Sequence, residues 1–127
     1  MNKKTVIFDL DGTLANIDVR RDKSLKPNGK LDWDIFAAPD SITNWDTPNE
    51  PVIKMAQMFD NEGFNIVIFS GRNDRGFDAT VEWLWDNKVP WDLLVMRPDK
   101  FKEKSWPIAR NNPATPDMRF MPDEILK

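Results

Sequence analysis

Two aspartates one residue apart, Asp9 and Asp11, are the side chains in this sequence best suited to chemistry. They follow residues 5–8, a β-branched and aromatic run that predicts a buried strand. Alternate residues leave a strand on the same side, and buried charge is costly unless it is paired or bound to a metal. The sequence has no histidine, so acid–base chemistry falls to carboxylates, lysine or arginine. The pair therefore indicates a functional site at the end of a strand; the structural alternative is a polar Asp-Gly turn.

The string Asp9-Leu10-Asp11-Gly12-Thr13 resembles the first motif of the haloacid dehalogenase-like (HAD) phosphatases, Asp-x-Asp-Gly-Thr. The resemblance implies that Asp9 is a nucleophile that becomes an aspartyl-phosphate, and that Asp11 acts as general acid and then as general base. It also implies Mg²⁺ as cofactor, held by Asp9 and the backbone carbonyl of Asp11, because a metal must neutralise the nucleophile and the phosphate. Thr13 would position the nucleophile and a phosphoryl oxygen, and Gly12 permits a sharp exit from the strand.

A second polar string, Ser70-Gly71-Arg72, follows a predicted buried strand over residues 65–69. A hydroxyl and a nearby backbone amide can hold phosphate oxygens, and Gly71 lets the backbone come close to a ligand. The string resembles the second HAD motif, which implies that Ser70 and Gly71 bind the transferring phosphate. Two interpretations of Arg72 stay open: it binds substrate phosphate, or it forms an ion pair.

A narrower resemblance involves the residues around the second motif and the third strand. The matching residues are Gly71, Arg72, Thr80, Trp83, Leu84 and residues 93–98. They look like the phosphatase domain of bacteriophage polynucleotide kinase/3′-phosphatase and related small HAD phosphatases. That implies a Mg²⁺-dependent phosphomonoester hydrolase whose substrates are 3′-phosphates of nucleotides or polynucleotide ends. Arg97 matches a substrate-contacting arginine of that group, and a solvated arginine at a strand end is its alternative.

Other functions stay open at this point. A nucleotidase acting on free mononucleotides shares the chemistry and differs only in substrate, and a non-catalytic phosphate-binding fragment is the rival from another class. No Gly-x-x-x-x-Gly-Lys-[Ser/Thr] string occurs, so the kinase half of the bifunctional enzymes is not expected.

Composition narrows the class of protein. The chain has 127 residues, which suits a single domain over residues 1–127, and it has no cysteine, which excludes a disulfide framework and thiolate chemistry. No apolar run is long enough to span a membrane and no secretory signal is evident, so we expect a cytoplasmic protein. The net charge of −3 does not favour long nucleic acid, although Lys100, Lys102 and Lys104 could steer a strand end toward Arg97.

The predicted elements alternate. Apolar residues recur at helical spacing over residues 50–62 and 77–87, and short apolar runs at 65–69 and 93–96 predict strands. This order predicts an α/β fold, a HAD-like (Rossmannoid) parallel sheet with helices on both faces.

Residues 16–48 form a long insert between the first strand and the first of these helices. Long connections in compact domains are usually functional, and HAD proteins carry a cap over the site at this point. The insert is too short for a full cap domain. Its large apolar residues either pack it down as a small lid or only fix a surface loop to the core. They are Trp33, Ile35, Phe36 and Trp45.

Residues 97–127 predict an irregular loop on the substrate side, followed by a helix start at 122–127. The resemblance places the lysine of the third HAD motif at Lys127, where it would neutralise charge on Asp9 and the phosphate. The acidic pair of the fourth motif has no counterpart. We therefore expect the C-terminal strands to be missing, with weak Mg²⁺ affinity, a mobile C-terminus and an exposed sheet edge open to self-association. The alternative is that a second chain, or residues beyond Lys127, supply the missing strand and acids.

Overall fold

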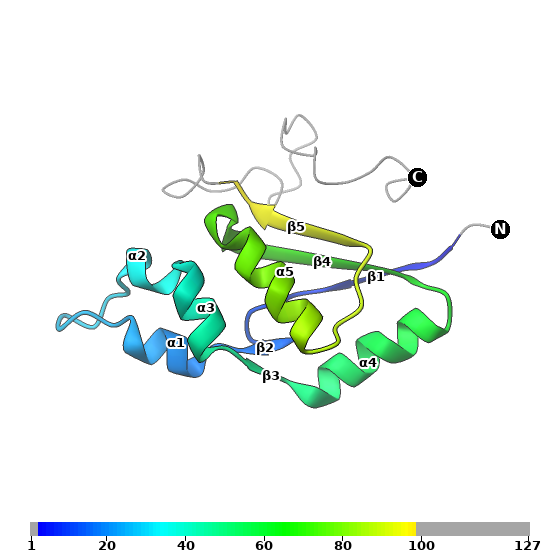
Figure 1. The fold of residues 1–127 in the computed structure, drawn as a ribbon, viewed down its shortest axis with the longest axis horizontal. Coiled ribbons are helices and arrows are strands. Elements are labelled where there is room, and N and C mark those ends of the chain that lie inside the picture. Colours follow the sequence, from blue (N-terminus) through cyan, green and yellow to red (C-terminus); the bar gives the residue numbers. More distant parts are fainter. Residues whose placement is uncertain (1–2, 99–127) are drawn as a thin grey trace.

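A three-stranded parallel sheet is the centre of the fold (Figure 1). The computed structural model describes residues 3–98. The strands are β1 (Thr5–Phe8), β4 (Asn65–Asn73) and β5 (Leu93–Arg97), in the order β1-β4-β5. β4 continues past residue 69, its predicted end, because its pairing with β5 resumes at Asn73 after an irregularity. The predicted parallel α/β architecture is confirmed.

Two helices connect these strands. They are α4 (Glu50–Asn61), between β1 and β4 in the sequence, and α5 (Phe77–Asp86), between β4 and β5. α5 is preceded by a short 3₁₀ turn, η1 (Asp74–Gly76). Each helix ends one residue before its predicted end, and Pro51 stands in the first turn of α4, where its missing N–H costs nothing.

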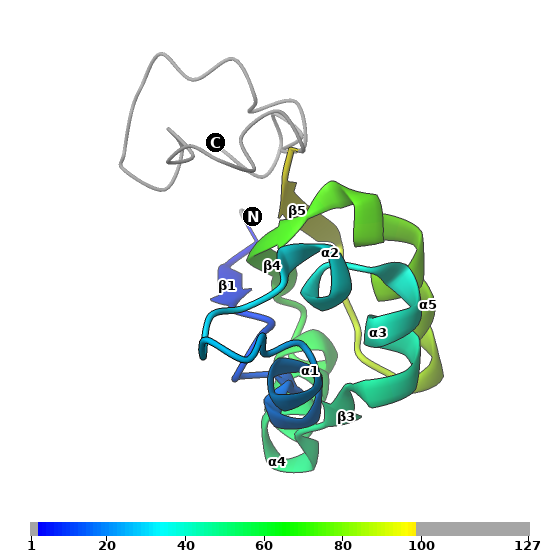
Figure 2. The same cartoon turned by 90° about the vertical axis from the view of Figure 1, so that its left-hand side faces the viewer.

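The core lies on one face of the sheet, where α4 and α5 pack. The strand residues that alternate toward this face and the helix residues that meet them are buried together: Phe8, Ile66, Ile68, Leu94, Met96, Ile53, Ala56, Trp83 and Leu84. Right-handed crossovers that advance in one direction place their helices on the same face, and Figures 1 and 2 show α4 and α5 on one side of the sheet. Within residues 3–98, the prediction of helices on both faces is therefore met on one face only.

The insert is more helical than a surface loop. It leaves and rejoins the core through an antiparallel pair of very short strands, β2 (Ala15–Asn16) and β3 (Thr47–Pro48). Between them lie α1 (Asp18–Lys23), α2 (Trp33–Phe36) and α3 (Pro39–Trp45), and α3 packs against α5.

The apolar residues of the insert divide into two kinds. Phe36 is buried and Trp45 is half-buried, as expected for residues that pack the insert onto the core. Ile35 and Trp33 are instead 40% and 66% exposed. Packing onto the core therefore accounts for only part of this apolar surface.

β1 lies at an edge of the described sheet, and its Ile7 is 65% exposed. Self-association through this edge stays a prediction. The expectations for residues 99–127, including the loop, the helix start and Lys127, lie outside the described residues. None of the helices formed within residues 3–98 has the length and hydrophobicity needed to cross a membrane.

Candidate active site

The two aspartates lie where β1 ends and the chain turns away from the sheet. Asp9 follows β1 directly and is exposed, and its Oδ1 accepts a hydrogen bond from the Leu10 N–H at 2.8 Å. Gly12 has a φ of +79°, a conformation that is strained for residues with a Cβ, and its N–H donates to the Ala15 carbonyl at 2.9 Å. This turn holds Asp11 beside the sheet and leads the chain into β2.

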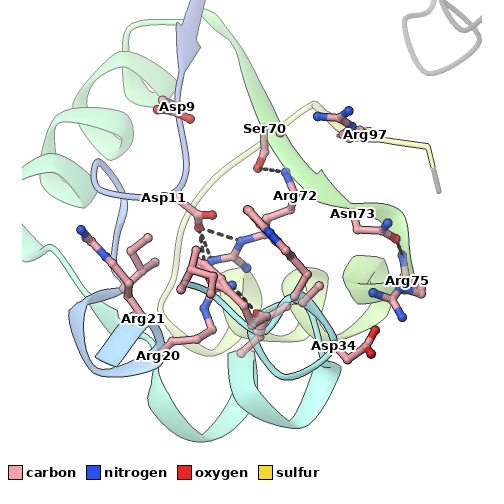
Figure 3. Close-up of a pocket in the computed structure, with 17 residues that line it drawn as sticks. Asp9, Asp11, Arg20, Arg21, Asp34, Ser70, Arg72, Asn73, Arg75 and Arg97 are labelled. Carbon is pink, nitrogen blue, oxygen red and sulfur yellow. Dashed lines mark hydrogen bonds and ion pairs between the residues drawn. The ribbon is translucent and has the colours of Figure 1, made fainter. Parts of the chain in front are cut away.

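Ser70 and Arg97 reach the same edge of the sheet from the neighbouring strands β4 and β5. Together with Asp9 and Asp11 they line a cavity of about 750 Å³ (Figure 3). Ser70 is buried, and its Oγ accepts a hydrogen bond at 3.0 Å from the backbone N–H two residues later. The carboxyl ends of parallel strands meet at one edge, which brings these residues together from positions far apart in the sequence.

The remaining predicted site residues differ in position. Gly71 also lines the cavity and is exposed. Thr13 is not among the described residues that line it; the Thr13 backbone carbonyl accepts a hydrogen bond from Asn49 Nδ2 at 2.8 Å. Lys127 lies outside the described residues.

Arg72 is the centre of a buried group of ion pairs. Its Nε and Nη2 lie 2.8 and 2.7 Å from Asp11 Oδ1, and Nη2 also lies 2.6 Å from Asp46 Oδ2. Its Nη1 donates to Thr80 Oγ1 at 3.0 Å. Of the two interpretations that the sequence left open for Arg72, the structure shows the ion pair.

Arg20, from α1 of the insert, completes this group. Its Nη2 lies 3.0 Å from Asp11 Oδ1, its Nε lies 2.8 Å from Asp46 Oδ1, and its Nη1 donates to the Phe36 carbonyl at 2.8 Å. We call Asp11, Arg20, Asp46 and Arg72 the ion-pair quartet. Its two positive and two negative charges balance, which buried ions require.

The quartet joins the insert to the core. Arg20 and Asp46 belong to the insert, whereas Asp11 follows β1 and Arg72 lies on β4. Burial raises the pKa of Asp46 because desolvation penalises its carboxylate, while the guanidinium groups of Arg72 and Arg20 act in the opposite direction. The orientation of Asp11 therefore depends on side chains that come from three separate segments.

Arg20 and Asp46 were not predicted from the sequence. Arg20 stands beside a second arginine in a helix with charged neighbours, and Asp46 follows a half-buried tryptophan. An ion pair between residues 26 positions apart leaves no periodic signal. Charged residues are usually exposed to solvent, so their residue types predicted exposed positions for Arg20 and Asp46, whereas both side chains are buried.

The described residues offer part of a Mg²⁺ site. The Asp9 carboxylate is exposed beside the cavity, and no described backbone N–H donates to the Asp11 carbonyl oxygen. Mg²⁺ commonly takes one or two carboxylates together with water and phosphate oxygens, so these two ligands fit. The Asp11 carboxylate fits less well, because its Oδ1 is engaged by two guanidinium groups. Residues 3–98 contain no cluster of three or more side chains able to hold a metal.

Solved structures of other proteins resemble this chain in sequence and fold. The structure titled "Structure of Pnkp1/Rnl/Hen1 complex" contains a chain that is 28% identical, with a TM-score of 0.64, over 85% of this chain and 32% of that one. A chain in "Structure of the Pnkp1/Rnl/Hen1 RNA repair complex" is 26% identical, with a TM-score of 0.62, over 91% of this chain and 33% of that one. The present chain thus spans about a third of the length of these relatives. No curated protein matches the sequence.

The family match covers most of the sequence. The family model described as the polynucleotide kinase PNKP phosphatase domain matches residues 3–111, which include the aspartate pair, Ser70 and the whole described sheet. The matched range also contains the insert and its half of the ion-pair quartet. The chain therefore belongs to the phosphatase domains of polynucleotide kinase PNKP, a HAD-type family of phosphoric monoester hydrolases.

Proposed function

We propose that this chain hydrolyses phosphomonoesters through an aspartyl-phosphate on Asp9, with 3′-phosphates of nucleotides or polynucleotide ends as substrates. One observation carries the proposal: an exposed carboxylate at the end of β1 shares a cavity with Ser70, in the carboxyl-terminal half of the neighbouring strand β4. A phosphoryl group between them meets a nucleophile on one side and a hydrogen-bonding hydroxyl on the other.

The proposed reaction has two steps. In the first, a carboxylate oxygen of Asp9 attacks phosphorus, the bond from phosphorus to the ester oxygen breaks, and Asp11 gives a proton to the leaving oxygen. In the second, Asp11 takes a proton from water, the water oxygen attacks phosphorus, and the bond from phosphorus to Asp9 breaks. Inorganic phosphate is released and both aspartates return to their starting states.

The quartet suits Asp11 to this role because it fixes one of the two carboxylate oxygens. Arg20 and Arg72 both contact Oδ1, and no described side chain donates to Oδ2. We assign the proton exchange to Oδ2. Phosphoryl transfer depends mainly on positioning and on compensation of charge, so an oriented acid–base group contributes directly to the rate.

The cofactor and the other contacts are part of the proposal. Mg²⁺ would be held by the Asp9 carboxylate and the Asp11 backbone carbonyl, and when bound it compensates the negative charge of nucleophile and phosphate. Ser70 and Gly71 bind phosphoryl oxygens, and Arg97 contacts the substrate. Thr13 supports Asp9, and Lys127 neutralises charge on Asp9 and the phosphate.

The substrate proposal rests on the family and on the relatives. The matched family is that of polynucleotide kinase phosphatase domains, and one similar structure is titled an RNA repair complex. A 3′-phosphorylated oligonucleotide, a nucleoside 3′-monophosphate and a sugar phosphate should be compared at equal concentration, with Mg²⁺ and with EDTA. We expect the two nucleotide substrates to react faster than the sugar phosphate, and EDTA to stop the reaction.

The same comparison of substrates can contradict the substrate assignment, the metal requirement and the catalytic role separately. Faster hydrolysis of the sugar phosphate would overturn the substrate assignment, and hydrolysis that survives EDTA would overturn the metal requirement. Binding of the oligonucleotide without any hydrolysis would favour the phosphate-binding alternative. If Lys100, Lys102 and Lys104 steer a strand end, the rate with the oligonucleotide should fall as salt rises, whereas the rate with the sugar phosphate should not.

A further inference from the structure

Trp33 leaves most of its side chain uncovered at the candidate active site. It is 66% exposed, and it lines the same cavity as Asp9 and Ser70. Exposure alone does not indicate a binding residue, because single apolar residues are common on protein surfaces. Trp85 on α5, for example, is 82% exposed. Trp85 lies away from this cavity, however, and lines a separate one. What distinguishes Trp33 is an open aromatic surface in the cavity that the proposed nucleophile also lines.

A helix cap and an aromatic contact fix the position of Trp33. It is the first residue of α2, and the Asp32 side chain caps this helix by accepting the Asp34 N–H at 3.1 Å. Its ring packs against buried Phe36, with the ring centroids 5.5 Å apart and an interplanar angle of 58°. The guanidinium of Arg20 lies 4.2 Å from the Phe36 centroid on top of that ring. The exposed indole is therefore supported by a buried aromatic residue that the ion-pair quartet holds in place.

The cavity around Trp33 is larger than a phosphate alone requires. Its volume of about 750 Å³ is in the range of pockets that enclose whole small molecules. Arg20, Arg72 and Asp11 of its lining belong to the charge-balanced ion-pair quartet. The other charged residues of the lining are three arginines and two aspartates: Arg21, Arg75, Arg97, Asp9 and Asp34. A ligand that matches this lining is anionic and carries a flat apolar group next to its phosphate.

We propose that Trp33 stacks on the terminal nucleobase of the 3′-phosphorylated strand end whose phosphate is transferred to Asp9. This inference rests on the proposed function and specifies what the site recognises besides phosphate. Every base has a π-face, so stacking on an aromatic side chain supplies affinity that tolerates any sequence. Because α2 belongs to the insert, the insert acts as a base platform as well as a wall of the cavity.

The test compares two substrates that differ only in the terminal base. One is a 3′-phosphorylated oligonucleotide, and the other is the same oligonucleotide with an abasic terminal residue that carries the 3′-phosphate. For Trp33→Ala we expect KM for the first substrate to rise by between about fivefold and about a hundredfold, with kcat nearly constant and a much smaller change for the abasic substrate. Trp33→Phe should recover most of the loss, because phenylalanine still stacks. Trp85→Ala, which removes a still more exposed tryptophan away from the cavity, should leave the hydrolysis of both substrates unaffected.

Two results with Trp33→Ala would overturn the inference. An equal loss on both substrates would mean that Trp33 only supports the insert, and an unchanged KM would mean that no base stacks there. Direct measurement of oligonucleotide binding separates a failure of the proposed function from a failure of the stacking inference. Wild-type protein could bind the base-containing end more tightly than the abasic end, with no such difference for Trp33→Ala, and yet hydrolyse neither substrate. That result would support base stacking and contradict the proposed catalysis. If both ends are hydrolysed equally well by wild type, catalysis stands and stacking falls.

Discussion

Asp9→Asn is expected to reduce phosphatase turnover by roughly a thousandfold or more, because an amide cannot form the acyl-phosphate. The fold should survive the change. Asp9 is exposed, and its one described hydrogen bond, from the Leu10 N–H to Oδ1, can be accepted equally well by an asparagine oxygen. The measurements are initial rates on a 3′-phosphorylated oligonucleotide and a denaturant unfolding curve for each protein.

A matched change separates loss of the nucleophile from loss of one negative charge. Asp60 is an exposed carboxylate on α4 that does not line the cavity, so Asp60→Asn should retain full activity. Aluminium fluoride, a mimic of the transferring phosphoryl group, should bind wild type far more tightly than Asp9→Asn. Substantial hydrolysis by Asp9→Asn with an unaltered unfolding curve would show that another residue is the nucleophile.

The second large effect is expected at Asp46, whose side chain is completely buried between two arginines. Asp46→Ala leaves the charges of Arg20 and Arg72 with only Asp11 to balance them. Removal of one member of a buried ion pair typically costs about 3–5 kcal/mol, because the remaining charge is left uncompensated away from water. Domains of this size are stable by only about 5–15 kcal/mol, so the loss should be visible as a large fall in the denaturant midpoint.

The chain contains its own control for this prediction. Arg21 and Asp18 form the same kind of pair at 3.2 Å on the surface of α1, with side chains 52% and 74% exposed. Asp18→Ala should cost no more than about 1 kcal/mol, since solvent already screens that pair. Equal costs at positions 46 and 18 would mean that the quartet contributes no special stability. Asp46→Ala should also lower phosphatase activity at temperatures where it is still folded, because Asp11 loses part of the network that orients it.

The sequence by itself determined the elements and the residues closest to the proposed chemistry. Continuous apolar runs predict the strands, and helical spacing predicts α4 and α5, because these patterns are local consequences of which face meets the core. The aspartates, Ser70 and Arg97 were predictable because each stands shortly after an apolar run that predicts a strand, in a string that resembles a known motif. The three helices of the insert are too short to give a periodic signal, so the sequence did not predict them.

Only the tertiary structure decided how charge is distributed around Asp11. Arg20 pairs with Asp46, and Arg72 pairs with both aspartates. These ion pairs form only because the fold brings α1, the end of α3 and β4 together, and no local sequence pattern predicts that contact. The same packing buries Phe36 and leaves Trp33 open beside the cavity, although both are aromatic residues of one four-residue helix. Sequence patterns report which residues prefer to be buried, whereas the placement of a charge or an aromatic ring depends on neighbours that are distant in the chain and adjacent only after folding.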